Sequence, residues 1–97
     1  MTENRSEHTY RIVVHGEVTG VGFRFSTVRE ARRYDGLRGA VRNNGPRTVE
    51  CVVQGPEPDV SRFIAWLREG PPSARVESAQ VSELSHPPDL GAFDITF

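Results

Sequence analysis

The stretch Gly16-Glu17-Val18-Thr19-Gly20-Val21-Gly22-Phe23-Arg24 organises this chain. It follows a β-branched run at residues 9–15 and precedes residues with helical spacing, so it predicts a loop between a strand and a helix. Its glycines tolerate left-handed conformations and have no Cβ to block an approaching anion. The first N–H groups of a helix favour negative charge, and Arg24 adds a planar charged fork. The stretch therefore predicts an oxyanion site, although short glycine motifs beside a surface arginine also occur by chance.

The other patterns predict an α+β domain with the order strand, helix, strand, strand, helix, strand, followed by a short terminal strand. β-Branched and alternating residues indicate strands, which we place at residues 9–15, 37–43, 48–54, 75–84 and 93–97. We expect one helix from the glycine loop to Gly36 and a second one whose apolar stripe is Val60, Phe63, Ile64 and Leu67. This is the order of the ferredoxin-like fold, a βαββαβ sandwich in which an antiparallel sheet carries both helices on one face.

Three separated blocks of residues narrow the prediction further. They are Gly16-x-Val18-x-Gly20-Val21-x-Phe23-Arg24, Gly39-x-Val41-Arg42-Asn43 and Val49-Glu50-x-x-x-Gln54-Gly55, with a closing Phe93-x-Ile95-x-Phe97. Together they resemble the acylphosphatase family over residues 9–97. The resemblance implies the ferredoxin-like fold and an enzyme that hydrolyses small acyl phosphates to a carboxylate and inorganic phosphate, without a metal or cofactor.

The same resemblance assigns roles to individual residues. It implies that Arg24 binds the phosphate and that Asn43 positions the attacking water. The backbone N–H groups expected to complete the phosphate cradle belong to Gly20, Val21, Gly22 and Phe23. These parts suit the reaction, because a carboxylate leaves without being protonated, so that positioning and electrostatic stabilisation remain to be supplied. From its position alone, the sequence favours Asn43 as a turn residue before Asn44-Gly45.

Several residues depart from the usual pattern of the family. Thr19 stands where glutamine is common, Gly22 where a bulkier residue is usual, Ala40 where tryptophan is frequent, and Arg47 where the hairpin turn has glycine. The connection around Asp35 also has one extra residue. We expect Gly22 to loosen the cradle and Ala40 to bury less apolar surface.

Length and composition limit the alternatives. A chain of 97 residues predicts one domain, here residues 9–97 after a flexible tail at residues 1–8. The polar N-terminal residues and the lack of a long apolar run favour a cytoplasmic protein without membrane contact. Cys51 is the only cysteine, which excludes an internal disulfide, and scattered histidines argue against a metal site. We expect a monomer.

The charges are unevenly distributed along the chain. The formal net charge of −1 argues against a surface built for nucleic acid. Residues 1–48 nevertheless carry nine arginines against five acids, whereas residues 49–97 carry three against eight. We therefore expect positive potential around the glycine loop, which would attract a small anion.

Two other functions remain open. The same cradle could serve a non-catalytic module that binds phosphate or carbamoyl phosphate, resembling the acylphosphatase-like domain of hydrogenase maturation proteins. An RNA-binding domain of similar fold would present aromatic residues on its central strands for base stacking. Residues 48–54 contain none, so RNA binding is the least favoured of these hypotheses.

Overall fold

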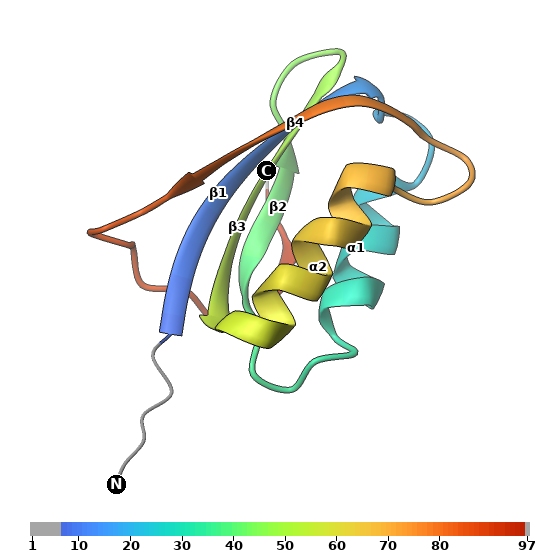
Figure 1. Ribbon diagram of the computed structural model, residues 1–97. Helices are drawn as coiled ribbons and strands as arrows, with labels where there is room; N and C mark the ends of the chain where they lie inside the picture. Colours follow the sequence, from blue (N-terminus) through green and yellow to red (C-terminus); the bar gives the residue numbers. More distant parts are fainter. Residues whose placement is uncertain (1–6, 97) are drawn as a thin grey trace, which may run out of the picture.

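The computed structural model describes residues 7–96, which form a five-stranded sheet with two helices on one face (Figure 1). The order of strands across the sheet is β4-β1-β3-β2-β5. The elements are β1 (Glu7–Glu17), α1 (Phe23–Ala31), β2 (Arg38–Asn43), β3 (Thr48–Pro56), α2 (Glu57–Glu69), β4 (Arg75–Glu83) and β5 (Asp94–Ile95). The predicted α+β, ferredoxin-like order is confirmed.

The ends of some elements differ from the prediction. β1 begins at Glu7, so residues 7 and 8 of the expected tail lie in a strand, while residues 1–6 and Phe97 lie outside the described residues. α1 ends at Ala31 and not near Gly36, because the chain tightens into turns in which the Tyr34 N–H donates to the carbonyl of Ala31 at 3.1 Å. β5 runs parallel to β2, so the sheet is mixed. The chain reaches β5 by crossing from β4 at one edge of the sheet to the other edge.

The core lies between the sheet and the helices. Alternate residues of β1, including Ile12 and Val14, are fully buried, as the period of two in a half-buried strand requires. α2 contributes Phe63, whose ring packs edge-on against Phe93 with centroids 5.4 Å apart. Burial of each large apolar side chain contributes about 1.5–3 kcal/mol. The amphipathic stripe predicted for α2 therefore does hold this helix on the sheet, with Leu67 also fully buried.

The opposite face of the sheet carries an ionic cluster. Glu50 on β3 accepts hydrogen bonds from Arg11 on β1 and from Arg42 on β2, the latter at 2.8 Å. Burial alone would raise the pKa of the Glu50 carboxyl, but the two arginines lower it below its ordinary value. Ala40, on this sheet, is half-buried and borders a cavity of about 280 Å³ that is also lined by Leu90. The small side chain of Ala40 therefore leaves space on this face.

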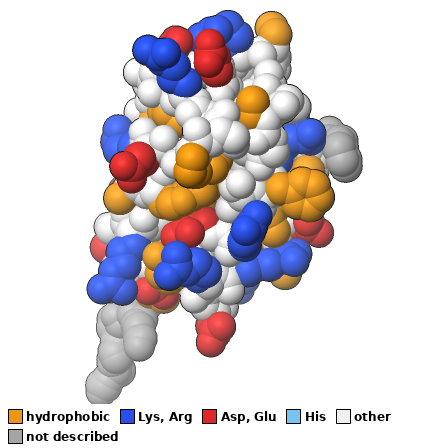
Figure 2. Space-filling model, turned by 90° about the vertical axis from the view of Figure 1, so that its right-hand side faces the viewer, with side chains coloured by type: hydrophobic (Ala, Val, Ile, Leu, Met, Phe, Trp, Pro, Cys, Tyr) orange, Lys and Arg blue, Asp and Glu red, His pale blue; other side chains and the backbone are white. Residues whose placement is uncertain are grey.

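The side of the molecule that the helices cover is mixed in character. Figure 2 shows basic, acidic and hydrophobic side chains interspersed there, with arginines beside hydrophobic groups in its lower half. None of the helices within residues 7–96 has the length and apolarity needed to cross a bilayer.

Candidate active site

The two residues expected to carry the chemistry face one cavity. Arg24, in the first turn of α1, and Asn43, the last residue of β2, line a space of about 260 Å³. Gly20, Gly22 and Phe23 of the glycine loop line it as well. We call this space the loop cavity. Residues that are 19 positions apart in sequence thus meet at one end of the sheet, where the strand β2 ends and the helix α1 begins.

The glycine loop has the backbone conformation that an anion site needs. Gly20 and Gly22 have φ angles of 73° and 76°, in the left-handed region that other residues adopt with strain. Gly22 is the N-cap of α1, and no side chain caps the first turn of this helix. The first N–H groups of a helix have no partner within the helix, so a helix start without a side-chain cap is suited to an anionic ligand. We expected Gly22 to loosen the cradle. Its place as a left-handed N-cap, however, is one that glycine adopts without strain.

Hydrogen bonds tie the loop to the turn between β2 and β3. The Thr19 hydroxyl donates to the carbonyl of Pro46 at 2.6 Å, and the Gly16 N–H donates to the carbonyl of Arg47 at 3.0 Å. The turn itself is closed by the Asn44 N–H, which donates to the carbonyl of Thr48 at 2.8 Å. This turn follows Asn43 directly. These bonds connect the turn that follows Asn43 with the glycine loop.

Asn43 lies at the end of a strand and not within the turn. It is the last residue of β2 and is paired in register with Val49 of β3, and its side chain is exposed toward the loop cavity. A carboxamide in this place can accept one hydrogen bond from a water molecule and donate another. The alternative interpretation of Asn43 as a turn residue therefore does not describe its position.

Val21 is the one expected binding residue that does not line the loop cavity. It is half-buried, and its carbonyl accepts a hydrogen bond of 2.9 Å from the Ser73 hydroxyl in the connection between α2 and β4. This bond anchors the middle of the glycine loop. A contribution of the Val21 N–H to phosphate binding stays a prediction.

Three lining residues were missed by the sequence reasoning. They are Val18, Phe25 and Ile95. Val18 is 1% exposed and belongs to the hydrophobic core, whereas Phe25 is 73% exposed. Phe25 falls in the expected first helix together with Val28 and Ala31 at helical spacing, a pattern that favours burial, yet its ring is exposed. Ile95 belonged to an expected strand, but only the pairing of β5 with β2 brings it to this end of the molecule.

Other reactive residues lie outside the loop cavity. Cys51 is fully buried, and this burial, with a smaller effect of the Glu50 charge, raises the pKa of its thiol. His15 lies on β1 with its Nδ1 atom 3.3 Å from the hydroxyl of Thr48. Glu17 is exposed at the end of β1. Across residues 7–96, His, Cys, Asp and Glu side chains form no group of three or more that could hold a metal ion.

Comparisons with known proteins agree on one family. A family model described as "Acylphosphatase" matches residues 10–95. The acylphosphatase of Burkholderia cenocepacia (strain HI2424) is 51% identical over 75 residues, which cover 77% of this chain and 76% of that protein. The solved structure of an acylphosphatase from Coxiella burnetii is similar with a TM-score of 0.87 and 32% identity, over 99% of this chain and 100% of that one. A crystal structure of full-length HypF is similar with a TM-score of 0.83 and 29% identity, over 100% of this chain but 13% of that one.

Proposed function

The chain belongs to the acylphosphatase family and is a hydrolase of acyl phosphates, and we propose that Arg24, Asn43 and the backbone of the glycine loop carry its chemistry without a metal ion. The observation that carries this proposal is that Arg24 and Asn43 line one cavity together with the two left-handed glycines, Gly20 and Gly22. The fold alone would not support it, because many functions share this fold.

The reaction makes few demands on the protein. Water attacks the phosphorus of R–CO–O–PO₃²⁻, the P–O bond to the acyl group breaks, and the products are R–COO⁻ and H₂PO₄⁻. The leaving carboxylate is stable at neutral pH, so no side chain has to protonate it. What the site must do is hold the phosphoryl group, stabilise charge on its equatorial oxygens and place the water in line.

Arg24 and the loop backbone are suited to the first two tasks. The guanidinium can donate two parallel hydrogen bonds to phosphate oxygens, and it lies where the positive end of the α1 dipole reaches the cavity. The backbone N–H groups of residues 20–23 then supply fixed dipoles, which need no reorganisation as charge develops. The substrate is thus held by the positive charge of a guanidinium and by main-chain N–H groups.

Asn43 is suited to the third task. Its carboxamide oxygen can accept a hydrogen bond from the attacking water and so orient it, without taking up a proton. The bonds from Thr19 and Gly16 to the neighbouring turn hold this residue at a fixed distance from the loop. Such rigidity matters because misplacement of a reacting group by about 1 Å can lower a rate by about 100-fold.

Two substitutions test these roles. We expect Arg24→Ala to lower kcat/KM for benzoyl phosphate by about 10³-fold or more, since an arginine on a transferring phosphoryl group contributes that much.

Asn43→Ala should lower kcat/KM for benzoyl phosphate by about 10²- to 10³-fold, the usual effect of removing one polar group that acts in the transition state. Arg62→Ala, on the exposed side of α2, is the matched control and should behave as wild type. Near-native activity of either site variant would contradict its role, and loss of activity with a chelator would contradict a metal-free reaction.

The non-catalytic alternative has less support. The matched acylphosphatases align with this chain over most of both proteins, whereas the match covers only 13% of HypF.

Because the loop cavity is lined by residues of a single chain, we further propose that the monomer is the active form. Size-exclusion chromatography at assay concentration tests this, and activity confined to a dimer peak would contradict it. A cytoplasmic location likewise stays a prediction.

A further inference from the structure

A second hollow adjoins the loop cavity. It has a volume of about 350 Å³ and runs between α1 and β5. Phe25 and Ile95 line both spaces, so they form the boundary at which one opens into the other. Val28, one turn further along α1 than Phe25, also lines the second hollow. We call this hollow the α1–β5 groove.

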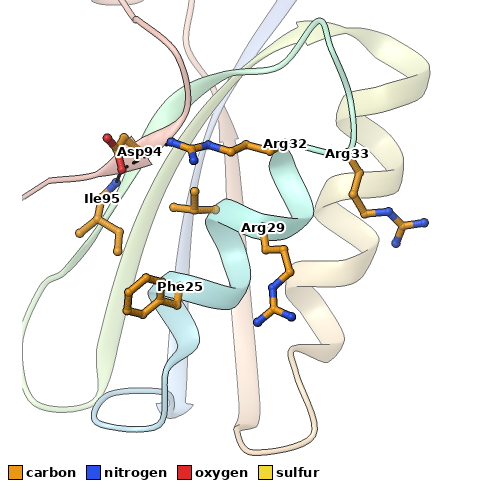
Figure 3. Close-up of a pocket in the computed structure, with 7 residues that line it drawn as sticks. Phe25, Arg29, Arg32, Arg33, Asp94 and Ile95 are labelled. Atoms are coloured by element: carbon orange, nitrogen blue, oxygen red, sulfur yellow. Dashed lines mark hydrogen bonds and ion pairs between the residues drawn. The ribbon is translucent and has the colours of Figure 1, made fainter.

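The exposed ring of Phe25 is the unusual feature of this groove. Phe25 is 73% exposed and is the one large hydrophobic side chain with such exposure among residues 7–96. Figure 3 shows the side chains of Phe25, from α1, and Ile95, from β5, next to one another, and both line the groove. An aromatic ring contributes most when another apolar group covers it. Folding does not cover Phe25, so its apolar surface is left for a ligand.

Three arginines, Arg29, Arg32 and Arg33, line the groove, and two of them are paired with groups of the protein. Arg32 donates to the carbonyl of Phe93 at 3.2 Å and lies 3.9 Å from the carboxylate of Asp94. Arg33 pairs with Glu30 at 3.4 Å, and in Figure 3 its guanidinium extends in the opposite direction from Arg32. The residues that the groove shares with the loop cavity are the apolar Phe25 and Ile95, whereas all three arginines line the groove alone.

The chemistry of an acyl phosphate connects the two spaces. Only one bridging oxygen separates the phosphorus from the acyl carbon, so an acyl group must lie directly beside whatever site holds the phosphoryl group. On one side the loop cavity is lined by the glycine loop and Arg24. On the other side it is lined by Phe25 and Ile95, which also line the α1–β5 groove.

Resting on the proposed function of the loop cavity, we propose that the α1–β5 groove is the acyl-group subsite, and that Phe25 makes this enzyme prefer acyl phosphates with an aromatic or branched aliphatic acyl group. The acyl group packs on the Phe25 ring and against Ile95 while Arg24 and the loop hold the phosphoryl group. An acetyl group is too short to cover the ring, so it gains little from this contact.

The test compares two substrates in three variants. Benzoyl phosphate and acetyl phosphate carry the same phosphoryl group, so the ratio of their kcat/KM values measures the preference for one acyl group over the other. The two substrates differ in intrinsic reactivity, but this difference is the same for every variant and cancels when the ratios are compared. We expect Phe25→Ala to lower the benzoyl-to-acetyl ratio by about five- to tenfold, mainly through a higher KM for benzoyl phosphate. Phe25→Leu, which keeps an apolar contact, should lower it by less than about threefold, and Arg62→Ala should not change it.

A second measurement needs no variant. Benzoate should inhibit the wild-type enzyme at lower concentration than acetate, because the same groove receives the carboxylate product. An unchanged substrate ratio in folded Phe25→Ala, or equal inhibition by benzoate and acetate, would overturn the subsite. These outcomes differ from those that would contradict the proposed function. Activity retained in Arg24→Ala and Asn43→Ala would contradict the roles of Arg24 and Asn43, independently of the result for Phe25→Ala.

Discussion

The side chain of Arg24 combines charge with shape, and the proposed mechanism depends on both. A guanidinium presents parallel N–H donors in one plane, whereas the ammonium group of lysine is a strongly hydrated point charge. The glycine loop brings main-chain groups to the same cavity, so the phosphoryl group would be held from two directions. The orientation of the donors is then as important as the positive charge.

Arg24→Lys separates these contributions. We expect kcat/KM for benzoyl phosphate to fall by about 100-fold, less than for Arg24→Ala, because the charge is kept and the bidentate geometry is lost. Steady-state kinetics of the two variants side by side provides the measurement. Wild-type activity in Arg24→Lys would show that charge suffices and that the fork has no special role.

Glu50 makes stability depend on pH. Burial acts against its ionised form, but Arg11 and Arg42 outweigh burial and hold the pKa of the carboxyl below its ordinary value of 4.5. The unfolded chain therefore binds this proton at a higher pH than the folded protein does. The stability that the cluster contributes is complete above that ordinary value and is lost as the pH falls through the lower pKa of the folded state.

Glu50→Gln tests this linkage by urea unfolding at several pH values. At pH 7 we expect the variant to be less stable by about 1–2 kcal/mol, since charge-assisted bonds from two half-exposed arginines to a buried carboxylate are replaced by neutral ones. The difference from wild type should shrink below about pH 4, where the carboxyl of wild type is itself neutralised. A difference that is constant from pH 7 to pH 3 would mean that Glu50 acts through its shape and not through its charge.

Among the secondary-structure elements, the glycine loop and the β2–β3 turn act as a unit. The loop contributes the cradle, and the turn follows the strand that carries Asn43. The Thr19 hydroxyl bridges them through the carbonyl of Pro46. Thr19 is a departure from the common glutamine of the family, and the structure gives it this bridging contact.

Thr19→Val removes the bridge and keeps the shape of the side chain. We expect kcat/KM to fall by about tenfold through kcat, because Asn43 and the loop lose a constraint on their relative position. Thr19→Ser retains the hydroxyl and should restore most of the activity. If Thr19→Val changes thermal stability but leaves kcat at the wild-type value, the bond is structural only and does not position the site.

For the molecule as a whole, the last strand links the core to the active site. Phe93 is 2% exposed and packs against Phe63 of α2, while Ile95, two residues later, lines both the loop cavity and the α1–β5 groove. Parallel pairing with β2 fixes this short strand beside the end of the sheet where Asn43 lies. The hydrophobic core therefore holds one wall of the site in place.

Phe93→Ala should expose this coupling. Removal of a buried phenylalanine typically costs about 3–5 kcal/mol, a large part of the roughly 5–15 kcal/mol that stabilises a domain. We expect a much lower midpoint of urea unfolding and, at a temperature where the variant is still folded, a higher KM for benzoyl phosphate. A loss of less than about 1 kcal/mol would show that the core closes around the gap and that β5 does not depend on this anchor.

The elements whose patterns were strong were predicted well. The stripe of Val60, Phe63 and Leu67 placed α2, and alternation placed β1 and β3, because burial of one face leaves a regular mark in the sequence. α1 was predicted too long, since the chain continues without a glycine or proline to Gly36 although turns replace the helix after Ala31. The parallel direction of β5 was missed, because two paired residues leave no pattern from which direction can be read.

The sequence determined the chemistry available to this protein: a glycine-rich start of a helix, one arginine beside it, one carboxamide and the order of strands and helices. These are local properties, set by backbone freedom, helical and strand periodicity and residue type. Only the tertiary structure decided which of these groups share a cavity, that Thr19 and Gly16 bind the turn beside Asn43, and that Phe25 stays exposed next to Ile95. Contacts of this kind depend on register and strand pairing between distant segments, and many of them are made by backbone carbonyls, which every residue has.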